Sequence, residues 1–171
     1  MNDDGIVSFQ EMADDEEDYK RLTDWLCNPK VREWYGADDF PSPPTAEEVK
    51  QKYAVRRLRE EETRPCFILI DGEPAGYIQY YPIREHGQAD GVYGVDLLIG
   101  EDGVRDRGFG TRALQAMTRF LFEQLHARKI LIDPDARNAR AIRCYEKCGF
   151  RPSYRTGEFL VMELDRPESG T

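Results

Sequence analysis

Residues 138–150 read Asn-Ala-Arg-Ala-Ile-Arg-Cys-Tyr-Glu-Lys-Cys-Gly-Phe, and this stretch decides the fold class. Asparagine is a preferred helix N-cap and glycine a preferred residue just past a helix end, so Asn138 and Gly149 bound one short predicted helix. Ile142, Tyr145 and Gly149 share one stripe of that helix. Tyr145 therefore has two interpretations, a tyrosine packed in the core or a phenol that faces a ligand.

About thirty residues earlier, a basic loop precedes an amphipathic segment; residues 105–111 read Arg-Asp-Arg-Gly-Phe-Gly-Thr. Its two glycines let the backbone approach a ligand, and the first helical turn offers free N–H groups at the positive end of the helix dipole. On the glycines alone, an ordinary turn at a helix start is the simpler interpretation. Walker and Rossmann loops are excluded because the Gly-Lys-Ser/Thr ending and the third glycine are missing. The pyrophosphate of coenzyme A is the remaining common candidate.

Hydrophobic periodicity predicts the elements around these two segments. Strands are expected at residues 6–12, 66–70, 75–83, 92–99, 129–132 and 159–164. Helices are expected at residues 16–27, 31–35, from the capping box at Thr45 to about Glu62, along Leu114, Met117, Leu121 and Leu125, and at 138–148. Asn28-Pro29 is expected to break the first helix. This order predicts an α+β, mixed α/β protein.

Length and composition exclude several classes of protein. A chain of 171 residues supports one core, so residues 1–171 are expected to form a single domain. No apolar run reaches the roughly 20 residues that span a bilayer, and the start lacks the features of a signal peptide, so we expect a cytoplasmic protein without membrane contact. A net charge of −9 disfavours nucleic acid as a partner and favours a polycationic small molecule.

The cysteines and histidines do not predict a metal site. The four cysteines form no CxxC pair, and His86 and His126 are the only histidines of the sequence. We expect reduced thiols and no metal.

Together, the basic glycine loop and the segment Asn-x-Arg-Ala-x-x-x-Tyr-x-x-x-Gly-Phe resemble the acetyltransferases of the GNAT superfamily. Within it the chain is similar to the aminoglycoside 6′-N-acetyltransferases. That resemblance is carried by residues 33–36 (Glu-Trp-Tyr-Gly), 72–77 (Gly-Glu-Pro-Ala-Gly-Tyr), 92–96 (Val-Tyr-Gly-Val-Asp) and 132–134 (Ile-Asp-Pro). One departure is Leu97, where members of that family carry glutamine. The resemblance implies a GNAT fold, with a twisted, mostly antiparallel mixed sheet flanked by helices. For the oligomeric state, a monomer and a homodimer both stay open.

The resemblance also implies acetyl-CoA as cosubstrate and a set of residues that hold it. These are Leu98, Ile99, Arg105, Arg107, Gly108, Phe109, Gly110, Thr111, Asn138, Ala141 and Tyr145. A phenol with a pKa near 10 is protonated at neutral pH, so Tyr145 can donate a proton to the leaving thiolate.

Two carboxylates are candidates for binding the acceptor amine. Asp96 lies in an otherwise apolar predicted strand, where an unpaired buried carboxylate is costly, so it is expected to face a cavity. There it binds the ammonium first and acts as a base second. Asp133 ends a neighbouring strand and is either a second ammonium ligand or the cap of a turn before Pro134.

Aromatic side chains complete the predicted substrate site. Trp34, Tyr35, Tyr80 and Tyr81 can offer faces to sugar rings and cations, although core packing is expected for at least half of them.

Three other functions stay open at this stage. A siderophore precursor or a protein N-terminus are alternative acceptors, although siderophore relatives tend to carry histidine where this chain has Asp96. A non-catalytic acetyl-CoA-binding module is the third alternative.

An acyl-cysteine route through Cys144 or Cys148 lacks an evident base, so direct transfer in a ternary complex is expected.

Overall fold

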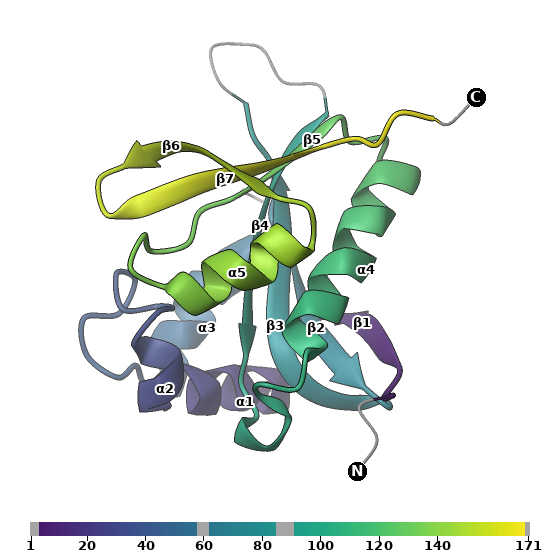
Figure 1. Cartoon of the computed structure of the whole chain (residues 1–171). Coiled ribbons are helices and arrows are strands. Elements are labelled where there is room, and N and C mark those ends of the chain that lie inside the picture. The colour runs from purple at the N-terminus through teal and green to yellow at the C-terminus, as the bar shows by residue number, and fades with distance from the viewer. Residues whose placement is uncertain (1–3, 58–61, 85–90, 170–171) are drawn as a thin grey trace.

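The computed structural model describes residues 4–57, 62–84 and 91–169, which build one twisted sheet with helices on both faces (Figure 1). The strands lie in the order β1-β2-β3-β4-β5-β7-β6, and every adjacent pair is antiparallel except β4 and β5. Their bounds are β1 (Val7–Glu11), β2 (Arg64–Ile70), β3 (Glu73–Pro82), β4 (Val92–Ile99), β5 (Lys129–Ile132), β6 (Arg151–Thr156) and β7 (Phe159–Asp165). The predicted α+β class with a mixed, mostly antiparallel sheet is confirmed.

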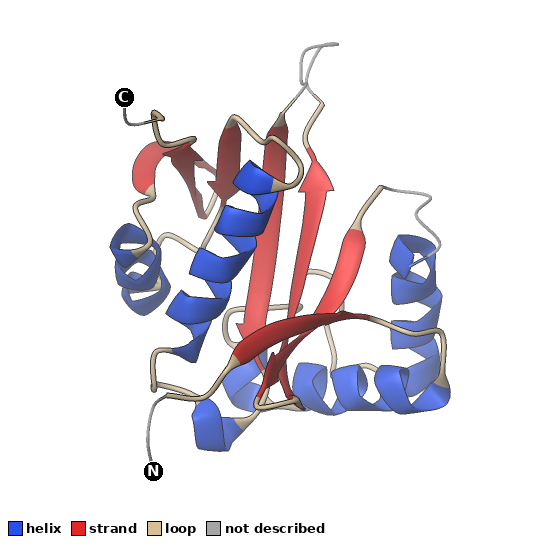
Figure 2. Ribbon diagram, turned by 90° about the vertical axis from the view of Figure 1, so that its right-hand side faces the viewer, coloured by secondary structure: helices blue, strands red, loops and turns tan. Residues whose placement is uncertain are grey.

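Helices cover the two faces of this sheet unequally, as Figure 2 shows from the side. On one face lie α1 (Glu16–Cys27), α2 (Pro29–Arg32) and α3 (Ala46–Arg57). The other face carries α4 (Phe109–Glu123) and α5 (Ala139–Lys147), and a short 3-10 turn, η1 (Asp102–Val104), precedes α4. None of the described helices is long and apolar enough to cross a bilayer.

The helix starts follow from side-chain caps. Thr45 and Glu48 form the predicted capping box, because the Glu48 N–H donates to Thr45 Oγ1 at 3.3 Å and the Thr45 N–H donates to Glu48 Oε2 at 2.7 Å. At α5, Asn138 Oδ1 accepts from the Ala141 N–H at 3.2 Å, and Gly149 has φ +97 just past the helix. The predicted bounds of α5 are thus confirmed.

One helix prediction needs correction, and a second can be tested only in part. Asn28 and Pro29 end α1 as expected but also begin α2, because Asn28 Oδ1 accepts from the Lys30 N–H at 3.0 Å and proline suits the first helical position. The predicted helix at 31–35 therefore lies earlier, at Pro29–Arg32. The helix expected to reach about Glu62 is described as far as Arg57. Residues 58–61 lie outside the described residues, as does His86. Glu62 has a left-handed φ of +56 and is therefore not helical.

Strand β6 is absent from the sequence-based prediction. All of its residues are exposed, so it has no alternation of apolar and polar side chains, and it contains Pro152. Pairing with β7 holds it in place, helped by the ion pair of Arg151 Nη2 with Glu163 Oε1 at 3.0 Å.

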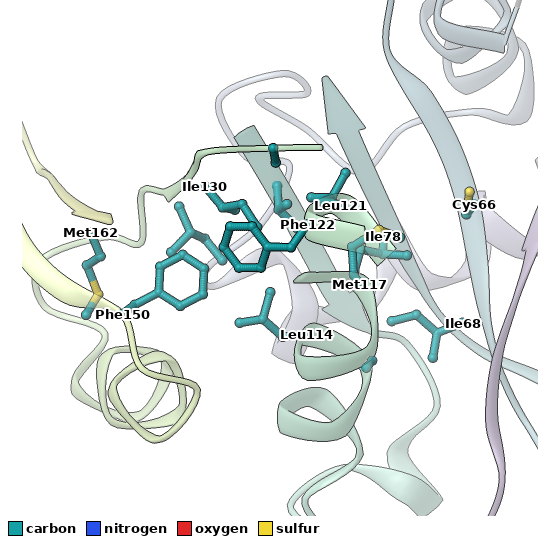
Figure 3. Packing of buried hydrophobic residues seen from close by; sticks show 14 residues of the cluster. Cys66, Ile68, Ile78, Leu114, Met117, Leu121, Phe122, Ile130, Phe150 and Met162 are labelled. Carbon is teal, nitrogen blue, oxygen red and sulfur yellow. The ribbon is translucent and has the colours of Figure 1, made fainter. Parts of the chain in front are cut away.

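The sheet separates two large clusters of buried side chains, and a small third cluster contains Ile70, Ala75 and Phe109. Figure 3 shows the one beneath α4, where Leu114, Met117 and Leu121 pack on Ile78 and Ile130. The cluster beneath α1 and α3 contains buried aromatic residues of these helices and of the strands: Tyr19, Trp25, Tyr53, Phe67 and Tyr77.

Alternation along β4 sets the direction of its side chains. Val95 and Leu97 pack in the cluster beneath α4, whereas Leu98 packs in the cluster beneath α1 and α3. Asp96 has the same parity as Leu98 and so faces the α1–α3 side.

Strands β4 and β5 are paired over only a short stretch, so the two strands separate beyond it. Their register covers only Val92–Gly94 of β4 against Lys129–Leu131 of β5. Beyond Gly94 no strand of the described chain pairs with this side of β4. The carboxyl ends of the two strands therefore diverge and leave room for a site between them.

Candidate active site

A cleft of about 740 Å³ opens where β4 and β5 diverge. Its walls are the ends of these two strands, the start of α4, one side of α5 and the turn after α2. Most of the predicted site residues line it: Trp34, Tyr35, Asp96, Leu98, Ile99, Arg105, Gly108, Gly110, Thr111, Asp133, Asn138, Ala141 and Tyr145.

The start of α4 forms one end of the cleft. Gly108 has φ +81, and no atom lies within 4 Å of a Cβ built on it, so the backbone there is open to a ligand. The following N–H groups belong to the first helical turn, which lacks intrahelical partners for them. Arg105 Nη2 donates to the carbonyl of Ile99 at 2.9 Å and ties this loop to the end of β4.

Basic side chains surround this end of the cleft. Arg105, Arg140, Arg143 and Lys147 line it, and Arg140 forms an ion pair with Asp106 that joins α5 to the loop. Cations, free N–H groups and an apolar strand edge match the phosphates and the extended arm of a coenzyme A molecule. The residues present fit this cosubstrate.

Carboxylates dominate the opposite end. Asp96 and Asp133 both line the cleft, as does Asp135, whose carboxylate pairs with Arg137 at 2.8 Å, so that its pKa is lowered to about 2. Desolvation, followed by the nearby charge of Asp96, raises the pKa of Asp133 to about 6. Although the Asp133 side chain remains open to the cleft, the surrounding walls remove part of its hydration. The two carboxylates are thus electrostatically coupled and suited to a cation.

The wall that carries Asp133 is bonded to the turn between β6 and β7. The N–H of Leu160 donates to the carbonyl of Pro134 at 2.9 Å, and the N–H of Ala136 donates to the carbonyl of Glu158 at 2.8 Å. An isolated bridge joins Asp135 to Phe159, which also lines the cleft. The hairpin therefore supports the acidic end.

Tyr145 lies on α5 and lines the same cleft. The centre of its ring lies 6.4 Å from that of Phe150, and the ring is half-buried against the core. Tyr145 therefore both packs against the core and lines the cleft, which combines the two interpretations offered by the sequence. Burial is the main cause that raises its pKa, and the charges of Cys144 and Asp96 add to it. The phenol therefore keeps its proton at neutral pH.

Comparison with known proteins decides the family. The family model of the acetyltransferase (GNAT) domain matches residues 14–156. The chain belongs to the GNAT acetyltransferases. The aminoglycoside N(6′)-acetyltransferase type 1 of Klebsiella pneumoniae is 34% identical over 142 residues, which cover 79% of this chain and 70% of that protein.

Solved GNAT structures agree with this assignment. The structure of the aminoglycoside acetyltransferase AAC(6′)-Ib in complex with ribostamycin and coenzyme A superposes with a TM-score of 0.82 at 31% identity, covering 94% of this chain and 93% of that one. A lysine N-acyltransferase of a Mycobacterium species is 25% identical over 80% of this chain and 57% of its own length. The predicted family is confirmed.

Four predicted residues of this GNAT site do not line the cleft: Arg107, Phe109, Tyr80 and Tyr81. Phe109 is buried with Ile70 and Ala75, and the Arg107 guanidinium lies over the Phe109 ring at 5.4 Å. Phe109 can therefore contribute only backbone groups to the loop. Alternation along β3 turns Tyr80 to the opposite face, where its ring lies 5.8 Å from that of Phe120 on α4. Tyr80 is a packing residue, which corrects its predicted substrate contact.

Sequence reasoning missed one polar residue beside Asp96. Gln79 on β3 lies directly opposite Asp96 on β4, and its Nε2 donates to Asp96 Oδ2 at 2.8 Å. A single amide within the otherwise apolar and aromatic strand 75–83 was the available signal.

The cysteines of α5 lie at the basic end. Cys144 Sγ is 3.0 Å from Thr111 Oγ1, and Cys148 Sγ lies 3.6 Å from the Thr111 carbonyl. Hydrogen bonding between the two thiols lowers the pKa of Cys144 and raises that of Cys148. In the described part of the chain, no group of three or more histidine, cysteine or acidic side chains is arranged to hold a metal ion.

Proposed function

We propose that this GNAT enzyme transfers the acetyl group of acetyl-CoA to the 6′-amine of aminoglycosides and thereby confers resistance to them. The observation that carries the proposal is the pair of coupled carboxylates, Asp96 and Asp133, at the end of the cleft opposite the basic coenzyme loop. Aminoglycosides are polycations, and the relatives that act on them match most of the chain.

The acceptor end offers both charge and surface to a cationic sugar. Asp96 and Asp133 hold ammonium groups, while Trp34, which is 40% exposed, and the neighbouring Tyr35 present aromatic faces at the mouth. Several amines on one substrate can then engage both carboxylates at once.

The chemistry follows from the positions of two groups. Bound acetyl-CoA supplies the thioester that the acceptor amine attacks. Asp96 orients the amine and takes up its proton, directly or through a water, because only a neutral amine carries the nucleophilic lone pair. Tyr145 holds a proton on a phenol of raised pKa and donates it to the departing thiolate.

Direct transfer is favoured over an acyl-cysteine intermediate. Cys144 contacts Thr111 in the first turn of α4, beside the basic side chains that line this end of the cleft. The reacting thioester belongs with Asp96 and Tyr145 instead.

A thiol-release assay with acetyl-CoA tests the proposal. We expect release with kanamycin and none with spermidine, lysine derivatives or peptides. A matched control is a pair of aminoglycosides that differ only at the 6′ position, where one carries an amine and the other a hydroxyl; only the amine should be acetylated. NMR of the product then locates the acetyl group. Acetylation of lysine derivatives or peptides alone would replace the acceptor and leave acetyl transfer intact.

A further inference from the structure

Gln79 is a buried amide with an unusual place in the sheet. It is 6% exposed, and the other polar side chains buried among residues 4–54, 62–84 and 91–169 are threonines: Thr23, Thr63 and Thr118. An amide hidden from water destabilises the fold unless both its ends are hydrogen bonded. The partners of Gln79 therefore indicate why it is there.

Both ends of the amide are engaged, and in one orientation. The Tyr77 hydroxyl donates to Gln79 Oε1 at 2.7 Å, and Gln79 Nε2 donates to Asp96 Oδ2 at 2.8 Å. A flipped amide would set Oε1 against a carboxylate oxygen, which is repulsive because neither group carries a proton to donate. The carboxylate thus receives an N–H donor from the sheet side.

The chain of contacts continues away from the cleft. Tyr77 is fully buried, and its ring meets the ring of Tyr53 on α3 edge to face at 5.5 Å. The donor that reaches Asp96 is consequently fixed by packing between the sheet and α3.

The hydrogen bond from Gln79 matters because, at Asp96, strand β4 is paired with a neighbouring strand of the described chain on one side only. Asp96 lies two residues beyond Gly94, where the pairing with β5 ends, while its pairing with Gln79 on β3 continues. Contacts from β3 therefore position the carboxylate at the open edge.

We propose that Gln79 is a positioning residue for acetyl transfer: anchored by Tyr77, it orients the Asp96 carboxylate toward the acceptor amine. The inference rests on the proposed role of Asp96 and adds the residue that makes this role effective.

Two substitutions of Gln79 separate positioning from folding. Gln79→Met keeps the length of the side chain and removes both hydrogen bonds, so KM for kanamycin should rise about 10- to 100-fold, as expected for loss of a hydrogen bond to a charged group. Acetyl-CoA affinity should stay unchanged. Tyr93→Phe, on the opposite face of β4, is the matched control and should behave as wild type.

Gln79→Glu supplies a pH signature. A protonated glutamic acid can still accept from Tyr77 and donate to Asp96, whereas an ionised one repels it, so two carboxylates at this distance share one proton. The ratio of variant to wild-type kcat/KM should therefore fall as the pH rises from 6 to 9. Asp133, Tyr145 and Tyr77 are also titratable, but they are common to both proteins, so their own titration is expected to cancel in the ratio.

A double-mutant cycle distinguishes failure of this inference from failure of the proposed function. In an Asp96→Asn background, Gln79→Met should add no further loss, because its partner charge is already gone. Wild-type kinetics in both Gln79 variants, with Asp96→Asn impaired, would overturn the positioning role alone. Normal acetylation by Asp96→Asn would overturn the role of Asp96 itself.

A purely structural role for Gln79 would lower the melting temperature and leave the activity ratio of Gln79→Glu flat with pH. If Gln79→Met does not fold, Tyr77→Phe takes its place, since it releases the amide from its anchor. That variant should raise KM for kanamycin in the wild-type background only, and an unchanged KM would count against the inference.

Discussion

The two ends of the cleft are formed by different kinds of groups, backbone N–H groups at one end and single side chains at the other. The coenzyme end uses consecutive backbone groups at the start of α4, with basic side chains of α5 beside them. The acceptor end gathers single side chains from β3, β4, the segment after β5 and the turn after α2. One end is therefore a local feature of the chain, while the other exists only after the sheet has formed.

This difference predicts that the two ends can be damaged separately and that the largest effect lies where they meet. Tyr145→Phe should lower kcat by about 10²–10⁴-fold, because a general acid is lost while both binding ends persist. Rates under conditions where chemistry limits turnover, with binding of each ligand measured by calorimetry, test this. Wild-type turnover would show that the Tyr145 ring only packs against Phe150.

At the acceptor end, Asp96→Asn should lower kcat/KM for kanamycin by about 10²-fold, since a hydrogen-bonded ionic contact with the amine is lost. Acetyl-CoA affinity should be unaffected. Thermal melts run beside the kinetics separate the alternatives: a lower melting temperature with normal acetylation would make Asp96 a structural residue.

At the coenzyme end, Gly108→Val should weaken acetyl-CoA binding about tenfold, because a β-branched residue resists the left-handed backbone at φ +81 by roughly 1–2 kcal/mol. Calorimetric titration of the folded variant gives the affinity. Gly72→Val is a matched control, as Gly72 has φ +83 in equally open space at the β2–β3 turn. Both variants should lose stability, and only Gly108→Val should lose affinity; equal affinities would refute the loop assignment.

The smallest expected effect concerns pH and stability at the acidic end. Burial raises the pKa of Asp133 to about 6, so the stability linked to this group is fully present below the ordinary pKa of 3.8 and is lost as the pH rises through about 6. Asp133→Asn should therefore raise the melting temperature by a few degrees at pH 8, and the gain should shrink toward pH 5.

The same substitution should raise KM for kanamycin at pH 8, where wild-type Asp133 is ionised. Melting curves and kinetics across this range test both statements. A variant that is less stable than wild type at pH 8 would show that the carboxylate caps its turn instead of facing the cleft.

Sequence reasoning succeeded where the signal is local. The caps at Asn138 and Thr45, the glycine loop before α4 and the alternating strands can each be identified within a few residues. It failed at β6, whose exposed residues carry no periodicity and which exists because β7 pairs with it.

The acceptor end shows the same limit. Tyr80 and Tyr81 are adjacent aromatic residues, and only the register of β3 reveals that Tyr80 turns toward α4 while the Tyr81 ring lies over Gly94. Gln79 could not be assigned to Asp96 before the pairing of β3 with β4 was known, because 17 residues separate them. The direction of Tyr80 and the contact of Gln79 with Asp96 depend on the pairing of strands that are distant in the sequence, and a short motif cannot predict them.

The hydrogen bonds between the segment that carries Asp133 and the β6–β7 hairpin suggest how the acceptor specificity of such an enzyme can diverge during evolution. Because Leu160 and Glu158 are hydrogen bonded to Pro134 and Ala136, we expect a change in the length of that exposed turn to move the acidic wall more than the start of α4. Acceptor range can thus diverge through insertions and deletions at the molecular surface while the cosubstrate stays the same. A library confined to the turn at residues 156–159 is consequently a more economical route to new acceptors than replacement of the carboxylates themselves.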